Sequence, residues 1–366
     1  MSDVEDEMTQ ALREWVVENV ALGVDRELIA QELTKRSVSP QAASEWIESV
    51  RSSPMVSTMS ELVYRQQKLS SLLQLLKGFF APPGDPSIDR ITHADSVAFF
   101  SDYFFKLRPV VVTGLADDWP ALSKWSPSYF REHFGNVEIS VNADRGSDEA
   151  FEENHLDHRT RISIRDFVEW MEHNPDSNDM YVTSRDNLLL NEHLQELRDD
   201  FRYPQPFLTE DSPATPEGFN ESLWFGAGSL TPLHHDDRSI LLVQIYGEKR
   251  FDLISPFDFG LVYNDRYCFS SIDPLDSPEL QQHLHSVVLG PGEALLIPVG
   301  YWHHVLSTSP SITLAFFNLP FDSLWRQSYY GDPDAPQSRY QPRPTPIPSA
   351  DRPSFADGAK SAPIEP

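Results

Sequence analysis

Two histidines and two aspartates stand together in TPLHHDDRSI, residues 231–240, shortly after a Thr-Pro pair. On a β-strand, residues i and i+2 point to the same face, so His234 and Asp236 form one pair. His235 and Asp237 form a second pair, which faces the opposite side. Two imidazoles and one carboxylate on one face of an octahedron can hold iron and leave three positions open for reactants. The stretch therefore predicts part of a metal site, with two registers open.

A third ligand must come from another strand, and GPGEALLIPVGYWHH (290–304) offers one. A tight turn is followed there by an apolar strand that ends in His303 and His304. Either histidine would complete the site if the strand ended beside the first pair. The alternative is chance, because the chain contains twelve histidines. Taken together the two motifs favour the metal site, since both lie in the strand-rich half of the chain.

A lysine downstream of the first motif adds a second kind of chemistry. Lys249 lies fifteen residues after His234, in YGEKRFDLI. A lysine that points into a barrel needs an anionic partner, because an unpaired buried ammonium is unfavourable. A dicarboxylate cosubstrate would be such a partner. The alternative is a solvated lysine on an outer face, and the residues alone leave both readings open.

The elements that must position these residues are mainly strands. From Leu223 onward short apolar runs alternate with Gly and Pro turns, which is typical of a sandwich or barrel. Shorter strands and two helices precede them between residues 108 and 186. The four main runs are LWFGAG, SILLVQIYGEKRFDLI, SVVLGPGEALLIPVG and SITLAFFNLP.

The N-terminal part has a different pattern. Residues 5–51 carry apolar side chains at helical spacing, which predicts three short helices separated by Gly and Pro signals. A longer helix over 59–79 carries Leu62, Leu69, Leu73 and Leu76 near a 3.5-residue repeat that Gln66 interrupts. This stripe predicts either a homodimer seam or an amphipathic helix docked on its own domain.

The chain therefore divides into four parts. We expect a small helical appendage (1–55), a linker or dimerisation helix (56–84), a main domain (85–330) and a disordered tail (331–366). The tail contains nine prolines and little apolar material, so it cannot bury enough surface to fold.

Composition limits the choice of partners and compartment. The chain has 366 residues, 40% of them hydrophobic, and a formal net charge of −27, which argues against nucleic-acid phosphates as the main partner. A basic peptide, a basic protein or a small molecule fits this charge better. One cysteine, Cys268, excludes a disulfide framework within one chain. The acidic start MSDVEDEM and the absence of a long apolar run predict a cytoplasmic protein with no membrane partner.

The ordered series of motifs resembles the JmjC and cupin-like family of Fe(II)- and 2-oxoglutarate-dependent oxygenases. The likeness is to the branch that contains the asparaginyl hydroxylase of hypoxia-inducible factor, and it extends from roughly residue 87 to 322. It rests on FFSDYFFKLRPVVVTGLADDWPALSKW, LWFGAGSLTPLHHDD and VVLGPGEALLIPVGYWHHV. The resemblance implies a mainly β fold with flanking helices: a double-stranded β-helix (jelly-roll) core preceded by a small helical N-terminal region.

The resemblance also selects a register and assigns roles. It implies iron ligands at His234, Asp236 and His303, and a cosubstrate-binding lysine at Lys249. Further cosubstrate contacts match Thr231, Tyr181 and Asn318, and candidate substrate contacts are Asp237, Arg238, Trp302 and His304. One departure is Ile240, because relatives carry an Asn at that position, six residues after the first ligand.

The implied enzyme is a hydroxylase that uses Fe(II), 2-oxoglutarate and O2. Decarboxylation of 2-oxoglutarate to succinate and CO2 would be coupled to hydroxylation of an amino-acid side chain in a peptide or protein. The alternatives are an RNA nucleoside hydroxylase, a non-catalytic metabolite or metal sensor, and a zinc hydrolase or isomerase. Lys249 argues against the zinc enzyme, the net charge argues against RNA, and Ile240 is the main argument for a sensor.

Overall fold

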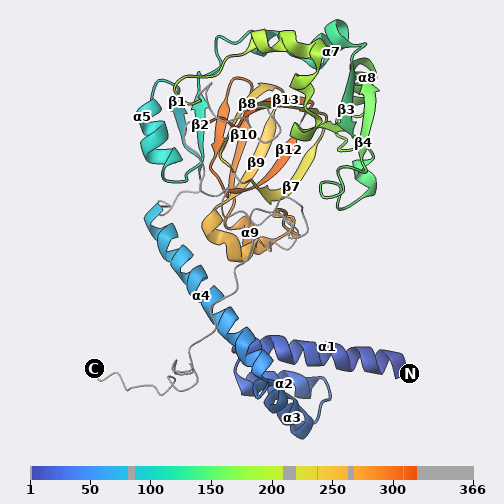
Figure 1. The fold of residues 1–366 in the computed structure, drawn as a ribbon, viewed down its shortest axis with the longest axis vertical. Helices are drawn as coiled ribbons and strands as arrows, with labels where there is room; N and C mark the ends of the chain where they lie inside the picture. Colours follow the sequence, from blue (N-terminus) through green and yellow to red (C-terminus); the bar gives the residue numbers. More distant parts are fainter. Residues whose placement is uncertain are drawn as a thin grey trace.

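The structure is a computed structural model that describes residues 2–80, 87–208, 220–236, 238–262, 268–307 and 309–319. Asp237 and the predicted tail 331–366 lie outside the described residues. A β-rich body and a group of small helices stand apart, joined by one long helix (Figure 1). No helix among the described residues combines the length and apolarity needed to cross a bilayer.

Three helices form the N-terminal group, as predicted: α1 (Ser2–Ala21), α2 (Arg26–Lys35) and α3 (Pro40–Arg51). Asp25 and Ser39 cap α2 and α3 by accepting hydrogen bonds from backbone N–H groups of the first turn. The group has its own small core, made of Val16, Ile29, Leu33, Ala43 and Ile47. It therefore does not depend on the β-rich body for its apolar packing.

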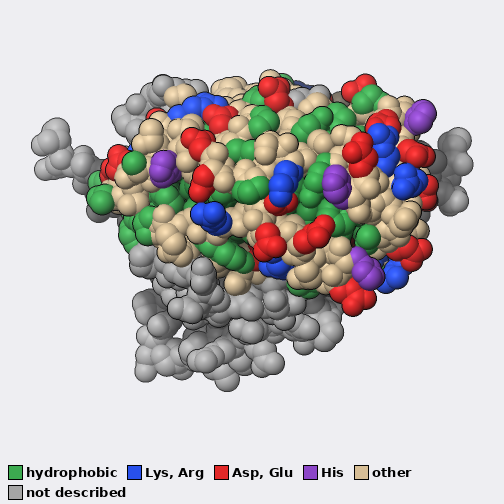
Figure 2. All heavy atoms as spheres, turned by 90° about the horizontal axis from the view of Figure 1, so that it is seen from above, with side chains coloured by type: hydrophobic (Ala, Val, Ile, Leu, Met, Phe, Trp, Pro, Cys, Tyr) green, Lys and Arg blue, Asp and Glu red, His purple; other side chains and the backbone are tan. Residues whose placement is uncertain are grey.

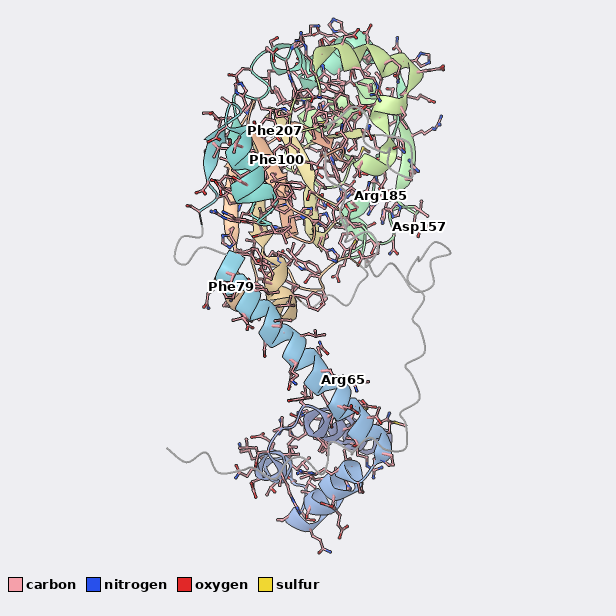
Figure 3. All side chains as sticks on the ribbon, turned by 60° about the vertical axis from the view of Figure 1, so that its left-hand side comes forward. Arg65, Phe79, Phe100, Asp157, Arg185 and Phe207 are labelled. Atoms are coloured by element: carbon pink, nitrogen blue, oxygen red, sulfur yellow. The ribbon has the colours of Figure 1, made fainter. Side chains whose placement is uncertain are left out.

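Helix α4 (Pro54–Phe80) connects the two bodies. Its C-terminal part docks on the β-rich body, where Lys77 Nζ lies 2.7 Å from a carboxylate oxygen of Asp258. Gln74 also donates to the Phe257 carbonyl at 2.9 Å. Several large apolar side chains on the helix are at least half exposed: Leu62, Leu69, Leu72, Leu75 and Phe79. Docking is thus present, and the dimer seam stays a prediction, because Leu62 and Leu69 of the predicted stripe are exposed. Phe79 lies at the docked end of the helix (Figure 3).

The β-rich body contains two sheets among the described residues. The first has the order β1-β2-β11-β8-β13-β6-β5-β3-β4, and the second has the order β10-β9-β12-β7. The strands of the first sheet are β1 (Arg90–Thr92), β2 (Val110–Thr113), β3 (Glu138–Asn142), β4 (Arg159–Ser163), β5 (Tyr181–Val182), β6 (Glu221–Gly226), β8 (Ile240–Tyr246), β11 (Ala294–Ile297) and β13 (Ser311–Phe316). Those of the second are β7 (Leu230–His235), β9 (Lys249–Ile254), β10 (His285–Leu289) and β12 (Trp302–Ser307).

Short helices surround the sheets. The α-helices are α5 (Ser96–Ala98), α6 (Ala121–Lys124), α7 (Pro127–Phe134), α8 (Ile164–His173) and α9 (Pro278–Gln281). A π-helical segment, η1 (Phe99–Phe104), follows α5. The 3-10 segments are η2 (Arg145–Ser147), η3 (Ser184–Asp186), η4 (Leu188–Leu190), η5 (Glu192–Asp200) and η6 (Pro256–Leu261). The predicted mainly β fold with flanking helices is confirmed.

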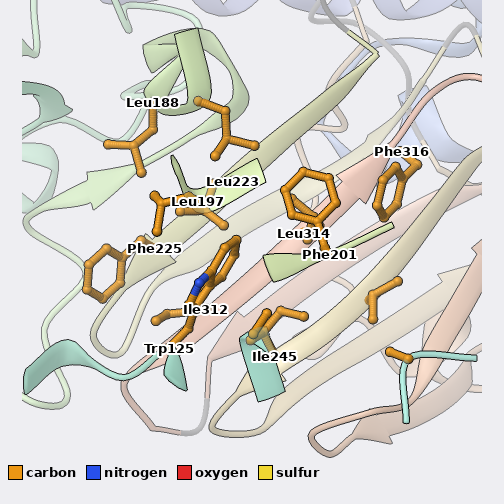
Figure 4. Packing of buried hydrophobic residues seen from close by; sticks show 14 of the residues in the cluster. Trp125, Leu188, Leu197, Phe201, Leu223, Phe225, Ile245, Ile312, Leu314 and Phe316 are labelled. Carbon is orange, nitrogen blue, oxygen red and sulfur yellow. The ribbon is translucent and has the colours of Figure 1, made fainter. Parts of the chain in front are cut away.

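Alternation along β13 divides the interior into two cores. Leu314 and Phe316 pack outward into a large aromatic core shared with Trp125 and Phe225 (Figure 4). Ala315, between them, points inward to the space between the two sheets. Because successive side chains point to opposite faces, each strand contributes both to this packed core and to the inner space.

Surface charge is spread over the β-rich body. Acidic, basic and hydrophobic side chains are interspersed on the face shown in Figure 2. The net charge of −27 is therefore not gathered into one acidic patch on this face.

Candidate metal and cosubstrate site

An extra residue in β7 sets the direction of the site residues. His303 of β12 pairs with His234, whereas Val305 pairs with Thr231, so two β7 residues lie opposite one β12 residue. Such a bulge reverses the alternation of the strand beyond it. Thr231 and His234 are three residues apart, yet both line the same cavity, together with Asp236. A strict period of two could not have placed all three side chains on one face.

His234, Asp236 and His303 form a compact group whose ligand atoms lie within 4.8 Å of one another. His303 Nε2 is 3.4 Å from a carboxylate oxygen of Asp236. The Nδ1 atoms of His234 and His303 lie 2.8 Å and 3.0 Å from the carbonyls of Pro232 and Tyr301. A carbonyl only accepts, so Nδ1 carries the proton in the neutral form of each ring, and Nε2 then keeps its lone pair.

The electrostatics of this group favour metal binding. Burial lowers the pKa of His234 to about 3, and the charge on His303 adds to this effect. Burial alone would raise the pKa of Asp236, but the protonated form of His303, which donates a hydrogen bond through Nε2, and the charges of the protonated histidines hold the pKa of this carboxyl well below its ordinary value. The group therefore offers a neutral imidazole at His234 and a carboxylate at Asp236 near neutral pH. With the second imidazole, this donor set fits Fe(II) with open coordination positions.

The group opens into a cavity of about 820 Å³, mouth included, between the two sheets. Lys249 lies in the same cavity and is only 2% exposed. Its Nζ donates to the Tyr181 hydroxyl at 3.0 Å. No carboxylate among the described residues lies within ion-pair distance of Lys249, so this part of the chain leaves the ammonium without a counter-charge that a bound anion could supply. A dicarboxylate cosubstrate fits this requirement, and Thr231 adds a hydroxyl to the same wall.

Part of the cavity wall is apolar. Ile240, the departure noted in the sequence, faces the cavity. Thr313, Ala315 and Phe317 face it from β13 and the residue after the strand. Asn318 is fully buried and is not part of the cavity wall. The cosubstrate contact expected of Asn318 stays a prediction, and its neighbour Phe317 faces the cavity.

Two candidate substrate contacts also need correction. Trp302 and His304 flank His303 on β12, so they point to the opposite face of the strand. The Trp302 ring packs edge-on against His235 at 4.6 Å. His304 Nδ1 lies 3.4 Å from a carboxylate oxygen of Asp252. Both side chains are buried away from the cavity, so their role is in packing.

Arg238 lies close to the cavity wall without being part of it. Its guanidinium carbon is 5.9 Å from the ring centre of Phe317, which lines the cavity. Asp237, its predicted neighbour in substrate contact, lies outside the described residues.

Several cavity residues were not among the candidates from the sequence, including Glu152, Thr183, Arg185 and Trp224. Trp224 lies on the strand LWFGAG and pairs with Thr313, which also lines the cavity. Once this pairing is known, alternation along the strand predicts that the Trp224 side chain points inward. Glu152, Thr183 and Arg185 come from loops and a short 3-10 turn. No periodicity governs such segments, so only the fold brings them to the cavity.

The class of the protein follows from this site and from comparison with known families. Residues 96–323, more than half of the chain, match the family described as cupin-like domain. The chain belongs to this family, within the JmjC group of Fe(II)- and 2-oxoglutarate-dependent oxygenases.

Individual relatives carry several different names. The chain is 27% identical to "Lysine-specific demethylase 8" of Xenopus tropicalis over 249 residues, 62% of this chain and 51% of that protein. It is 26% identical to the human "Bifunctional peptidase and (3S)-lysyl hydroxylase JMJD7" over 262 residues, 61% of this chain and 81% of that protein. It is 25% identical to "tRNA wybutosine-synthesizing protein 5" of Gallus gallus over 271 residues, 68% and 82% of the two chains. The chain spans about half the length of several relatives that it matches.

Proposed function

We propose that this protein is a dioxygenase that uses Fe(II) and 2-oxoglutarate to hydroxylate an amino-acid side chain in a peptide or protein. One observation carries the proposal. The His234, Asp236 and His303 group opens into the same cavity as Lys249, a buried ammonium without a carboxylate partner among the described residues.

Each side chain has a distinct part in this proposal. The two Nε2 atoms and the Asp236 carboxylate would hold Fe(II), and the backbone carbonyls behind the two rings fix their orientation. Lys249 and the Tyr181 hydroxyl would bind the distal carboxylate of 2-oxoglutarate. When bound, iron and 2-oxoglutarate supply an O2-dependent oxidation in which one oxygen atom enters succinate and the other enters the substrate C–H bond.

The cavity walls contribute exclusion of water. Leu242, Phe251 and Val305 line the cavity between the charged groups. A dry wall strengthens the attraction between Lys249 and a carboxylate, because the effective dielectric constant is lower there than in water. The same wall limits side reactions of the oxidant with solvent.

Support for a peptide or protein substrate comes from relatives and from charge. Two relatives are named as a lysine-specific demethylase and a lysyl hydroxylase. A third is named for tRNA wybutosine synthesis, which supports a nucleoside hydroxylase as the second candidate. The net charge of −27 disfavours a polyanion, so we favour the peptide. A non-catalytic sensor draws its support from the apolar wall at Ile240 and Phe317.

One experiment separates these functions. Fe(II) and 2-oxoglutarate are added without oxygen, and the visible charge-transfer band of the chelate is recorded; air is then admitted and succinate is measured. We expect both the band and succinate. A band without succinate would indicate a sensor, and the absence of both would overturn the oxygenase. His303→Ala is the control, since it removes one ligand and should abolish the band.

A further inference from the structure

One charged side chain at the cavity is left without a task in the proposed reaction. Four charged side chains line the cavity among the described residues: Glu152, Arg185, Asp236 and Lys249. Asp236 is assigned to the metal and Lys249 to the cosubstrate. Glu152 is already held between two arginines. Arg185 therefore remains as the cavity cation that is available to a substrate.

Glu152 holds the Arg185 side chain in place. Arg185 Nη1 lies 2.8 Å from Glu152 Oε2, and the Arg185 side chain is 39% exposed. On the other side of the same carboxylate, Arg145 Nη2 lies 2.8 Å from Glu152 Oε1. One negative charge thus faces two guanidinium groups, and Arg145 is 1% exposed. The cluster keeps one positive charge in excess, and Arg185 is its exposed member.

The backbone of Arg185 is fixed as well. Its carbonyl accepts a hydrogen bond from Arg159 Nη2 at 2.6 Å, in the 3-10 turn η3. Burial and the charge of Arg185 lower the pKa of the nearby His155, so that imidazole adds no charge near neutral pH. Figure 3 shows Arg185 on the same side of the β-rich body as Asp157, away from α4. Arg185 is therefore a positioned cation and not a freely rotating surface residue.

The guanidinium retains hydrogen-bonding capacity. Its Nη1 donates to Glu152, while Nε and Nη2 have no partner among the described residues. A guanidinium with free, fixed donors binds a carboxylate through two parallel hydrogen bonds. Prior fixation by Glu152 reduces the entropy lost when such a ligand binds.

We propose that Arg185 selects peptide substrates that present a carboxylate beside the residue to be hydroxylated. This inference rests on the proposed function, and it names the substrate class of the same site. It refines the expectation of a basic partner, because the net charge acts over the whole surface whereas Arg185 acts at the mouth of the cavity. A polyphosphate chain is disfavoured by the same net charge.

The test uses the full chain with Fe(II) and 2-oxoglutarate and a library of short peptides in matched pairs. The two members of each pair differ only by Asp or Glu in place of Asn or Gln near the centre. Binding is followed without oxygen as the peptide-induced change of the visible chelate band. Hydroxylation is followed in air as the gain of one oxygen atom in the peptide mass.

We expect kcat/KM to be at least about 10-fold higher for the acidic members, the effect of one charge-assisted contact of about 1.4 kcal/mol. In Arg185→Gln this preference should fall to about twofold or less, mainly through KM. Arg185→Lys should retain only part of the preference for acidic peptides, because lysine lacks the planar guanidinium group. The control is Arg131→Gln on α7, which breaks a similar Arg–Glu pair with Glu172 on the outer surface and should keep the preference.

The outcomes separate this inference from the proposed function. Succinate formation with equal rates for acidic and amide peptides would overturn the role of Arg185 and leave the oxygenase standing. Reaction with an RNA oligonucleotide but with no library peptide would also overturn it. Failure to form any succinate would overturn the proposed function and the inference together.

Discussion

At the scale of single residues, β12 places two histidines side by side with opposite duties. His303 faces the cavity, and its Nδ1 lies 3.0 Å from the Tyr301 carbonyl. His304 faces away and meets Asp252, whose carboxylate also accepts hydrogen bonds from Ser286 and Arg250. Burial alone would raise the pKa of Asp252, but these three donors hold it below its ordinary value.

This arrangement predicts contrasting effects of two neighbouring substitutions. His303→Ala should abolish the Fe(II)–2-oxoglutarate band with little loss of folding stability, because it removes a metal ligand. His304→Ala should keep the band and lower the free energy of unfolding by about 1–3 kcal/mol, because Asp252 loses a buried donor. The band and chemical unfolding curves are measured on both variants. Loss of the band in His304→Ala and not in His303→Ala would show that His304 is the ligand.

Lys249 provides a second prediction at this scale. Lys249→Ala should raise the dissociation constant for 2-oxoglutarate by about 100-fold, since the dicarboxylate loses its buried counter-charge. Binding of Mn2+ without 2-oxoglutarate should change by less than about twofold. Calorimetric titration measures both constants. Unchanged affinity for 2-oxoglutarate would exclude Lys249 as the cosubstrate contact.

At the scale of elements, the loop between β3 and β4 supplies Glu152 to the cavity wall and is held by an ion pair. His158 Nε2 lies 3.1 Å from a carboxylate oxygen of Asp148. This hydrogen bond raises the pKa of His158. Hydrogen bonds from Asn154 and then His158 lower the pKa of Asp148 to about 2. Below the raised pKa of His158, the pair therefore joins a protonated histidine to an ionised aspartate across the loop.

The sign of these shifts predicts how the loop responds to pH. The stabilisation from His158 is fully present below about pH 6.5 and is lost as pH rises through its raised folded-state pKa. The stabilisation from Asp148 is present above about pH 4 and is lost as pH falls toward 2. Amide hydrogen exchange over 143–158, corrected for intrinsic rates, should be slower at pH 6 than at pH 8.5. In His158→Gln this difference should vanish; an equal difference in both proteins would contradict the assignment.

Helix α4 carries the prediction of a homodimer. Leu62 and Leu69, one heptad apart, are 58% and 62% exposed, and such apolar area on a helix is reduced by pairing with a second copy. Light scattering after size exclusion should give twice the chain mass. Leu62→Glu combined with Leu69→Glu should give the chain mass, whereas Val97→Glu, at a 78% exposed site on α5, should not. A monomeric wild-type protein would leave the stripe without this explanation.

At the scale of the whole molecule, the separate cores predict separate unfolding transitions. The core of the N-terminal helices shares no residue with those of the β-rich body. Ile47→Ala should lower the stability of the helical transition alone by about 2–4 kcal/mol. Mn2+ with 2-oxoglutarate should raise the melting temperature of the β-rich transition alone. Differential scanning calorimetry tests both, and a single transition shifted by both changes would show that α4 couples the bodies.

Features that depend on neighbouring residues could be predicted from the sequence, whereas features that depend on distant residues could not. Alternation and helical spacing are local, so the strands after Leu223 and the N-terminal helices could be predicted. The pairing of His234 with His303 could not, because residues 69 positions apart in the sequence meet only through the sheet order. The bulge before His234 also reverses alternation, so Thr231 was placed by resemblance and not by spacing.

The extra residue of β7 also affects how this site can evolve. It aims Thr231 and His234 at once, so a deletion there would turn one of them away, and no point substitution could restore it. Strand β7 can therefore lose this residue only together with the site. Ile240 lies on β8 and Phe317 follows β13, so neither residue belongs to that bulge pairing. We therefore expect related sequences to differ at the cavity-wall residues that face the cosubstrate sooner than at the metal ligands.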